Sequence, residues 1–245
     1  MTLTRLALPA ALAAALTLGG CAYNETLGRN QLLIVDDSTL AQQADAAWAE
    51  ALRTQPVSRD ATLNQRIRRV GDRVVAGAGL GDRSWDYAVF VSDSPNAFVL
   101  PNYKIGVTTG LLSLVKNDDQ LATVIGHEVG HVVARHGAER ASSNALGGLI
   151  QSGIGSYGET AGGVAGVITQ YGFLLRYSRR DELEADRLGV DYMQAAGYRP
   201  SEAIALWQLM SQQRQTATPE FASTHPSDAS RIAALQQYIA TRGWN

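Results

Sequence analysis

The sequence predicts an α+β fold that is mainly helical and holds a small antiparallel sheet. Apolar residues recur at the three-to-four-residue spacing of helices through most of the chain, whereas strand signals are confined to about residues 85–108. The chain has 245 residues, of which 45% are hydrophobic and 18% are charged. This length and composition suit a packed core, and we expect one domain over residues 40–245.

Residues Met1–Gly20 have the composition of a signal peptide. A single basic residue, Arg5, precedes an Ala- and Leu-rich run over Leu6–Leu18 that is shorter than a membrane-spanning helix. Two glycines come before the only cysteine, Cys21, and this arrangement resembles the bacterial lipobox, in which the thiol is acylated and the chain is cut just before it. A plain signal peptide with an incidental cysteine is the alternative. We expect a lipid-anchored periplasmic protein, and Ala22 favours the outer membrane.

Charge and cysteine content exclude several classes of protein. The 21 basic and 23 acidic residues give a formal net charge of −2, which leaves no positive surplus to neutralise phosphates, so we expect no nucleic-acid partner. One cysteine excludes an intrachain disulfide and a thiolate-based zinc cluster. A metal site must therefore use histidine and carboxylate side chains, and the chain has only four histidines.

Two helices are expected in the first third of the chain. Residues 21–39 are interpreted as a tether and lead-in. A first helix carries apolar residues four apart over residues 40–52 and ends before Pro56. A second helix gathers apolar residues on one face over residues 63–74, and three glycines over residues 77–81 stop it.

The strand signals follow these helices. Alternation over residues 85–91 predicts a half-buried strand, and Ser92–Asn96 has the composition of a turn. Two further short extended segments are expected at Ala97–Leu100 and Ile105–Thr108, separated by Pro101-Asn102. We expect a small antiparallel meander with an exposed edge.

The remaining elements are helical apart from one Gly-rich stretch. Thr109 is expected to cap a short helix, and Asn117 to cap a longer one that ends near His136-Gly137. Residues 140–175 are rich in Gly, Ala and Ser and predict a mobile or loosely packed loop with short helical pieces. Further helices are expected over Tyr177–Ala196, Ser201–Gln213 and Asp228–Thr241.

The most informative motif is His127-Glu128-Val129-Gly130-His131, inside the helix capped by Asn117. Residues four apart on a helix lie one above the other, so His127 and His131 present two imidazoles to one point, an arrangement that suits Zn²⁺. Glu128 is the expected base, which takes a proton from a water molecule as the water attacks a carbonyl group. A chance match of this pattern is the alternative, but the apolar opposing face of the helix and an acidic third ligand downstream favour a metal site.

A hydrolytic zinc site needs three protein ligands and one open position. The metzincin extension is excluded, because it requires Gly and His where this chain has Ala134 and Gly137. Glu182 and Asp186 share one helical face; we expect Glu182 to bind the metal and Asp186 to accept the Nδ1 proton of a ligand histidine. Glu184 points about 160° away from Glu182 and is not expected to share this task. The alternative is that the charged run Tyr177–Asp186 is only a solvent-exposed helix face.

Further motifs resemble the HtpX-like and CAAX-prenyl-protease-like zinc endopeptidases, specifically their periplasmic lipoprotein branch. The resemblance covers about residues 60–240 and rests on Asn96-Ala97-Phe98, Gly106–Leu112, the His127–His131 helix, Ser178-Arg179 with Glu182 and Asp186, and Thr224-His225-Pro226-Ser227 with Arg231-Ile232. It implies a zincin-type catalytic domain, with the sheet beside the histidine helix and Glu182 as third zinc ligand. Prenylated and intramembrane substrates are not carried over, because we expect no transmembrane helix.

Three further residues, His225, Arg231 and His136, are candidates for a role near the predicted metal site. His225 lies in a loop that approaches the zinc in the family, where it would stabilise the developing oxyanion or occupy the open coordination position in a resting state; a surface-loop histidine is the alternative. Arg231 is expected to pair with an acidic residue near the metal, or only to anchor its helix. His136 is interpreted as structural, because it lies off the ligand face.

The expected edge strand suggests how a substrate binds. An unpaired strand next to the zinc helix captures an extended peptide by backbone hydrogen bonds, which gives affinity without strict sequence preference. The Gly-rich segment 141–172 is interpreted as a lid over the same cleft.

We therefore expect a zinc endopeptidase with one Zn²⁺ per chain that cleaves unfolded or misassembled envelope proteins. The alternative is a non-hydrolytic, chaperone-like lipoprotein that holds such clients around a structural zinc, although such a protein does not need Glu128. An exported zinc amidase that acts on cell-wall peptides is disfavoured by the resemblance to endopeptidases.

Overall fold

The computed structural model describes residues 20–151, 177–213, 225 and 229–244. In chain order, the described elements are β1 (Cys21–Asn24), β2 (Arg29–Leu32), α2 (Asp37–Thr54), α3 (Ala61–Gly77), β3 (Asp86–Phe90), β4 (Ala97–Leu100), β5 (Lys104–Thr108), α4 (Thr109–Leu114), α5 (Asp118–Val133), α6 (His136–Gln151), α8 (Arg179–Ala195), α9 (Ser201–Gln213) and α11 (Ala229–Thr241).

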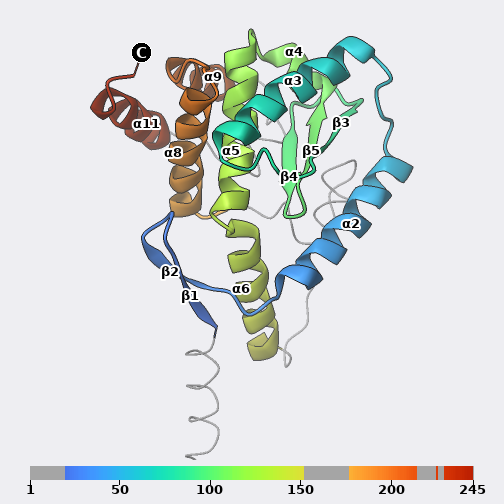
Figure 1. Cartoon of the computed structure of the whole chain (residues 1–245), viewed down its shortest axis with the longest axis vertical. Helices are drawn as coiled ribbons and strands as arrows, with labels where there is room; N and C mark the ends of the chain where they lie inside the picture. The colour runs from blue at the N-terminus through green and yellow to red at the C-terminus, as the bar shows by residue number, and fades with distance from the viewer. Residues whose placement is uncertain (1–19, 152–176, 214–224, 226–228, 245) are drawn as a thin grey trace, which may run out of the picture.

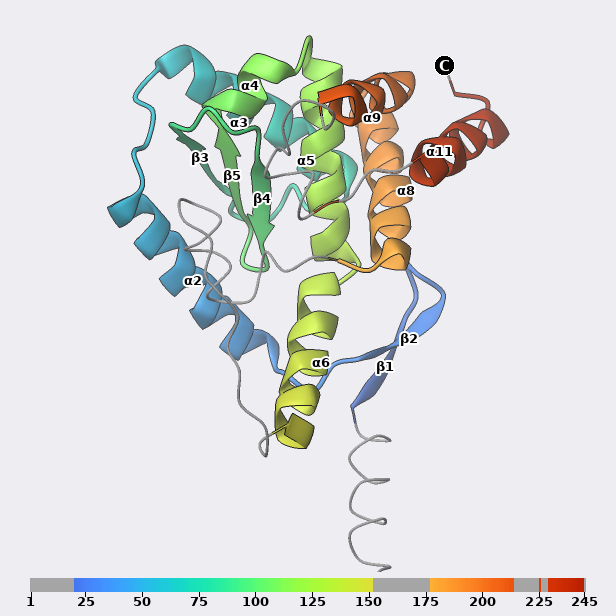
Figure 2. The same cartoon turned by 180° about the vertical axis from the view of Figure 1, so that it is seen from behind.

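Two long helices, α5 and α8, lie side by side at the centre of the molecule (Figure 1). The sheet formed by β3, β4 and β5 lies on one side of this pair, and α11 lies on the other, as the reverse view also shows (Figure 2). The prediction of a mainly helical α+β fold is confirmed. Among the described residues, no helix combines the length and hydropathy needed to cross a lipid bilayer. The predicted signal peptide lies almost entirely outside the described residues.

Small residues let α5 and α8 pack very closely. A Cβ atom on Gly126 or Gly130 of α5 would lie 2.8 Å from the backbone oxygen of Gly189 or Ala185 of α8, respectively. A Cβ atom on Gly189 would in turn lie 2.7 Å from the backbone nitrogen of His127. These separations leave no space for a side chain, so the two backbones are in direct contact. This close approach brings the carboxylates of α8 to the histidines of α5.

The central sheet is mixed, whereas the sequence predicts an antiparallel meander. The strand order is β3-β5-β4, with β5 parallel to β3 and antiparallel to β4. Gly106 in the central strand leaves space for aromatic rings from both outer strands. A Cβ atom there would lie 2.3 Å from the ring of Phe98 and 3.0 Å from the ring of Phe90.

A hydrogen-bonded bend takes the chain from β3 to the far side of β5. The backbone N–H groups of Ser92 and Asn96 donate to the side-chain oxygens of Thr109, at 3.0 Å, and Thr108, at 2.8 Å. Because Thr108 ends β5 and Thr109 directly follows it, the bend places β4 beyond β5 and not next to β3. Thr108, in place of the expected Thr109, caps α4 by accepting a hydrogen bond from the backbone N–H of Leu111. The result is an edge strand, β4, that packs beside α5.

Residues 21–39, interpreted from the sequence as a tether and lead-in, contain the hairpin of β1 and β2. The hairpin lies beside the start of α6 (Figure 1). Gln31 of β2 is buried and donates from its side chain to the backbone oxygen of Ala134 at 2.8 Å. The segment is therefore attached to the helical core by specific contacts.

The chain forms a helix where the sequence predicts a loosely packed loop. Helix α5 ends at Val133, and Arg135 adopts a φ of 55°, which interrupts the helical path. Helix α6 then begins at His136 and runs to Gln151. The remainder of the expected lid, residues 152–172, lies outside the described residues.

Candidate metal centre

Helix α5 carries both histidines of the motif into the core. It begins after Asn117, whose side-chain oxygen accepts a hydrogen bond from the backbone N–H of Gln120 at 2.8 Å. His127 and His131 lie one turn apart, both side chains are buried, and their Nε2 atoms lie 3.2 Å apart. The helix therefore brings two imidazole nitrogens to one point.

Helix α8 supplies a carboxylate to the same point. It begins with a reciprocal capping box between Ser178 and Asp181, which fixes its first turn. Oε2 of Glu182 lies 3.5 Å from Nε2 of His127, and Oε1 lies 3.6 Å from Nε2 of His131. Glu182 is only 1% exposed, so the carboxylate and the two imidazoles share one buried position.

His225 completes a group of four. Its Nδ1 lies 3.2 Å from Nε2 of His127 and 3.0 Å from Oε1 of Glu182, and its side chain is fully buried. The donor atoms of His127, His131, Glu182 and His225 all lie within 4.8 Å of one another. The residues on either side of His225 lie outside the described part of the chain.

This donor set fits a tetrahedral metal ion. Ligand atoms that bind Zn²⁺ at about 2.0–2.1 Å in a tetrahedron lie about 3.3 Å from one another. Five of the six separations among the four donors, given above, run from 3.0 to 3.6 Å, and the sixth, between His131 and His225, is within 4.8 Å. Imidazole and carboxylate ligands in this number are typical of zinc sites. The four residues can therefore hold one metal ion, with His225 in the fourth position.

Asp186 and Arg231 lie behind the ligand groups and orient them. Oδ1 of Asp186, one turn after Glu182, lies 2.9 Å from Nδ1 of His127. Arg231 of α11 donates through Nε to Oδ2 of Asp186 at 2.8 Å and through Nη1 to Oε2 of Glu182 at 2.6 Å. Its guanidinium carbon also lies 4.3 Å from the centre of the Trp207 ring. This buried cation offsets the charge of two buried carboxylates and fixes their rotamers.

The charges at this point favour a bound cation. Burial raises the pKa of Glu182, but the charge of His225 and a hydrogen bond from His127 outweigh burial and hold this pKa well below its ordinary value. Burial likewise lowers the pKa of His127, but hydrogen bonds to Asp186 and Glu182 outweigh it and raise the pKa to about 9. The acidic groups therefore stabilise a positive charge where the four donors meet.

Glu128 lies beside the ligand groups and is not one of them. Its Oε1 lies 3.3 Å from Nε2 of His225 and accepts no hydrogen bond from the described residues. Burial raises the pKa of Glu128, and this effect is only partly opposed by the charges of His225 and His127 and by a hydrogen bond from the Val99 backbone of β4. A carboxylate with a raised pKa is suited to accept a proton near neutral pH.

Three residues around His131 were not expected to act there. Nδ1 of His136 lies 2.9 Å from Nδ1 of His131, and Nε2 of His136 lies 2.9 Å from Oε2 of Glu184. The ring of Tyr177 stacks on the ring of His131, with centroids 3.9 Å apart. His136 does lie off the ligand face, as the sequence indicates, but it contacts one of the candidate ligands directly.

Arg29 of the N-terminal hairpin connects these acidic groups. Its guanidinium donates twice to the carboxylate of Glu139, at 2.9 Å each, and twice to the carboxylate of Glu184, at 2.8 Å each. The Arg29 side chain is 16% exposed. No local spacing rule finds this contact, because 155 positions separate Arg29 from Glu184. The hairpin thereby reaches His131 through Glu184 and His136.

Comparison with known proteins gives one family and several relatives. Residues 61–239 match the model described as Peptidase family M48. The mitochondrial metalloendopeptidase OMA1 of Schizosaccharomyces pombe is 36% identical over 176 residues, which cover 71% of this chain and 52% of the relative. Human metalloendopeptidase OMA1, mitochondrial, is 29% identical over 235 residues, which cover 86% of this chain and 44% of the relative. The beta-barrel assembly-enhancing protease of Escherichia coli is 28% identical over 210 residues, with 78% and 42% covered.

The chain spans about half or less of the length of these curated relatives. Their names, together with the family match, confirm the prediction of a metallopeptidase. The finer resemblance to the HtpX-like and CAAX-prenyl-protease-like groups stays a prediction. The family match contains the motif helix α5, helix α8 and residue 225. This chain belongs to peptidase family M48.

Proposed function

We propose that the chain is a zinc-dependent endopeptidase in which His127, His131 and Glu182 hold the ion. When bound, Zn²⁺ supplies Lewis acidity, which lowers the pKa of a water molecule and polarises the carbonyl group of the scissile peptide bond. The observation that carries this proposal is Glu128, an ionisable side chain with a raised pKa directly beside the ligand groups. A zinc site that only stabilises the fold needs no such base.

The remaining groups of the site position this chemistry. Glu128 takes a proton from the attacking water and passes it to the amine that leaves. Asp186 accepts the Nδ1 proton of His127, so the lone pair on Nε2 stays directed at the ion. Arg231 keeps the carboxylates of Asp186 and Glu182 ionised and in place through its three short hydrogen bonds.

His225 holds the site in a resting form. Its Nδ1 lies among the donor atoms of the other ligands, so it fills the fourth position that catalysis requires to be open. With an ion held by His127, His131 and Glu182, His225 would have to leave this position to admit the carbonyl group of a substrate.

We propose unfolded or misassembled envelope proteins as substrates. Strand β4 lies at the edge of the sheet beside α5, and its outer side pairs with no described strand. An extended peptide adds there as a further strand through main-chain hydrogen bonds, which tolerate many sequences. The name of the Escherichia coli relative, a beta-barrel assembly-enhancing protease, supports envelope proteins as the class of substrate.

We propose that a lipid on Cys21 anchors the protein to the periplasmic face of the outer membrane, as in the lipoprotein branch that the sequence resembles. Cys21 is exposed at the start of β1 and directly follows the predicted signal peptide. Labelling with a palmitate analogue should mark the wild type and spare Cys21→Ser. A wild-type protein without label would refute the anchor and leave the peptidase proposal standing.

The proposed activity is tested with unfolded casein. Cleavage is expected for the zinc-loaded wild type, and it should stop on chelation and return with added Zn²⁺. Glu128→Gln should bind zinc as tightly as the wild type and cleave at least about 100-fold more slowly. Glu25→Gln is the control and should cleave normally, because Glu25 is exposed in the turn between β1 and β2. Equal cleavage by Glu128→Gln and the wild type would refute the proposal, and tight binding of casein without cleavage by any sample would favour the chaperone-like alternative.

A further inference from the structure

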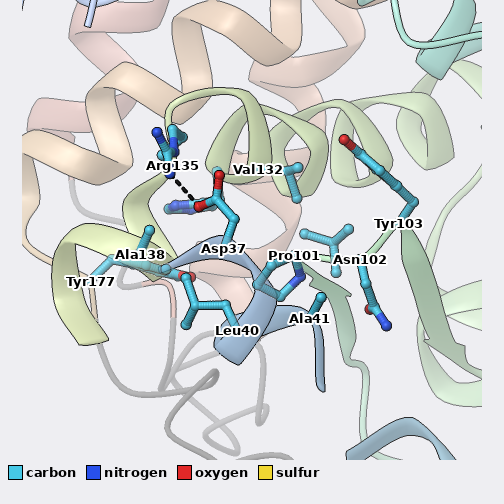
Figure 3. A pocket seen from close by; sticks show the side chains of 13 residues that line it. Asp37, Leu40, Ala41, Pro101, Asn102, Tyr103, Val132, Arg135, Ala138 and Tyr177 are labelled. Carbon is cyan, nitrogen blue, oxygen red and sulfur yellow. Dashed lines mark hydrogen bonds and ion pairs between the residues drawn. The ribbon is translucent and has the colours of Figure 1, made fainter. Parts of the chain in front are cut away.

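His131 is one of the residues that line a cavity of about 500 Å³. Figure 3 shows this cavity from close by. Its walls come from the first turns of α2, the turn between β4 and β5, the end of α5 and the start of α6. Val99 of β4 and His131 of the candidate metal centre also line it. This cavity, called the α2 pocket below, therefore adjoins the proposed catalytic site.

The walls of the α2 pocket are mainly apolar. The apolar side chains that line it are Leu40, Ala41, Val99, Pro101, Val132 and Ala138. The charged residues Asp37 and Arg135 form an ion pair with each other (Figure 3), and 76% and 41% of their side chains are exposed. Such a pocket favours an uncharged apolar side chain, because burial of apolar surface is favourable and an ionised group would lose its hydration.

Two residues with left-handed backbone conformations shape the pocket. Tyr103 has a φ of 66° and Arg135 has a φ of 55°, and no other described residue except glycine has a positive φ. Tyr103 ends the turn between β4 and β5, and Arg135 directly follows Ala134, the C-cap residue of α5. This conformation is costly for side chains other than glycine, and both residues that adopt it line the same cavity. The backbone therefore retains the shape of this pocket at an energetic cost.

The position of the pocket along β4 determines which part of a substrate reaches it. A peptide paired antiparallel with β4, the more common orientation of strand pairs, runs from the Pro101 end of the strand towards Ala97. The Val99 backbone contacts the proposed base Glu128, so the scissile bond lies near Val99. The pocket extends from Val99 towards Pro101 and Asn102. Residues on the amino-terminal side of the scissile bond therefore pass its entrance.

We propose that the α2 pocket binds an apolar side chain of the substrate, one or two residues before the scissile bond. This inference rests on the proposed peptidase function and adds a side-chain preference to recognition that otherwise uses the backbone. Leucine and phenylalanine are the side chains expected to bind, and aspartate and lysine are excluded. The wall made by α2 precedes residue 61, where the match to the family model begins, so the preference depends on this chain's N-terminal segment.

The test uses variants that narrow the pocket from two of its walls, one made by α2 and one by α6. Ala41→Phe fills it from α2, and Ala46→Phe is the matched control, because Ala46 is exposed on the same helix. Gly137→Leu fills it from α6, where an added Cβ would meet only Cγ of Pro101, at 3.8 Å. Thermal unfolding of each variant checks that the fold is retained.

Binding and cleavage are measured separately. Fluorescent decapeptides of Gly, Ser and Thr carry one Leu, Ala or Asp at a single position. In the Glu128→Gln background, the Leu peptide should bind at least about tenfold tighter than the Ala peptide. Ala41→Phe and Gly137→Leu should reduce this ratio to about twofold or less, and Ala46→Phe should leave it unchanged. Mass spectrometry of wild-type products should place the cut within two residues after Leu.

Each outcome separates the pocket from the peptidase proposal. If the ratio of the affinities for the Leu and Ala peptides were the same in all three variants, the proposed role of the pocket would be refuted. Cuts that consistently precede Leu would refute it too. Cleavage without any preference for Leu would also refute the proposed role of the pocket, but it would agree with the peptidase proposal. Binding that prefers Leu and is lost in Ala41→Phe, without cleavage by the zinc-loaded wild type, would support the pocket and refute the peptidase.

Discussion

Nδ1 of His131 lies 2.9 Å from Nδ1 of His136, and both imidazoles are buried. A histidine that binds an ion through Nε2 carries its proton on Nδ1. His131 in this state therefore donates a hydrogen bond from Nδ1 to Nδ1 of His136. His136 then carries its own proton on Nε2 and donates to Oε2 of Glu184 at 2.9 Å. Asp186 plays the corresponding part for His127. Both histidines of the α5 motif therefore have a partner that fixes the tautomer and the direction of the ring.

We expect His136→Ala to weaken zinc binding about 10- to 100-fold, the usual cost of losing the partner of a ligand histidine. Competition with a chelator of known affinity measures the change. His136→Asn should lose less zinc affinity than His136→Ala, because the asparagine side-chain oxygen can still accept a hydrogen bond from Nδ1 of His131. An unchanged affinity in His136→Ala would mean that the stacked ring of Tyr177 alone orients His131.

Helical spacing accounts for only part of this site. Glu182 and Asp186 are four apart within one helix, as are the two histidines of the motif, so spacing alone places each pair on one face. His136 follows His131 by five positions and would point elsewhere on a continuous helix. Arg135, with a φ of 55°, breaks the helix between them and turns His136 back towards His131. Nothing in the pattern of residues marks Arg135 for this conformation.

The fold shows the same division between local and long-range information. The two short extended segments predicted on either side of Pro101-Asn102 match the strands that the structure has at 97–100 and 104–108 to within one residue. Their order in the sheet depends on hydrogen bonds from the 92–96 bend to Thr108 and Thr109, which no periodicity encodes. The paired hydrogen bonds from Arg29 to Glu184 likewise join segments that are far apart in the chain. Local patterns therefore identify elements, and individual side-chain contacts decide their neighbours.

Gly126→Ala is expected to destabilise the fold by about 1–3 kcal/mol, because the added Cβ would lie 2.8 Å from the backbone oxygen of Gly189 and force α5 and α8 apart. Gly137→Ala is the matched control, since its Cβ would meet only Cγ of Pro101 at 3.8 Å, and it should be neutral or stabilising. Urea unfolding measures both free energies. Equal effects of the two substitutions would contradict direct backbone contact between α5 and α8.

Asp118, in the first turn of α5, provides a pH-dependent contribution to stability. Burial raises its pKa, but hydrogen bonds from Arg69 and Arg66, at 2.8 Å each, outweigh burial and leave the pKa below its ordinary value. The folded state therefore favours the ionised form, and the stabilisation is complete above the unfolded pKa of about 3.9 and is lost as the pH falls through the lower folded value.

We expect Asp118→Asn to lower the free energy of unfolding at pH 7 by about 0.5 kcal/mol, a value reduced for solvent screening because the side chain is 35% exposed. The difference between wild type and variant should stay constant from about pH 5 to 8 and shrink below about pH 4. Urea titrations across this range measure it. A difference that grows on acidification would show that the arginines do not stabilise the carboxylate.

His225 distinguishes a blocked resting site from one that is permanently open. Its Nδ1 lies 3.0 Å from Oε1 of Glu182 and 3.2 Å from Nε2 of His127, where a fourth ligand would lie. We expect His225→Ala to bind zinc more weakly, because one donor is lost, and to cleave unfolded casein faster at saturating zinc, because the fourth position is open. Chelator competition and initial rates measure the two effects independently. If cleavage were lost while zinc affinity stayed unchanged, His225 would act on the substrate and not on the ion, and its buried position among the ligands would describe a catalytic contact instead of a block.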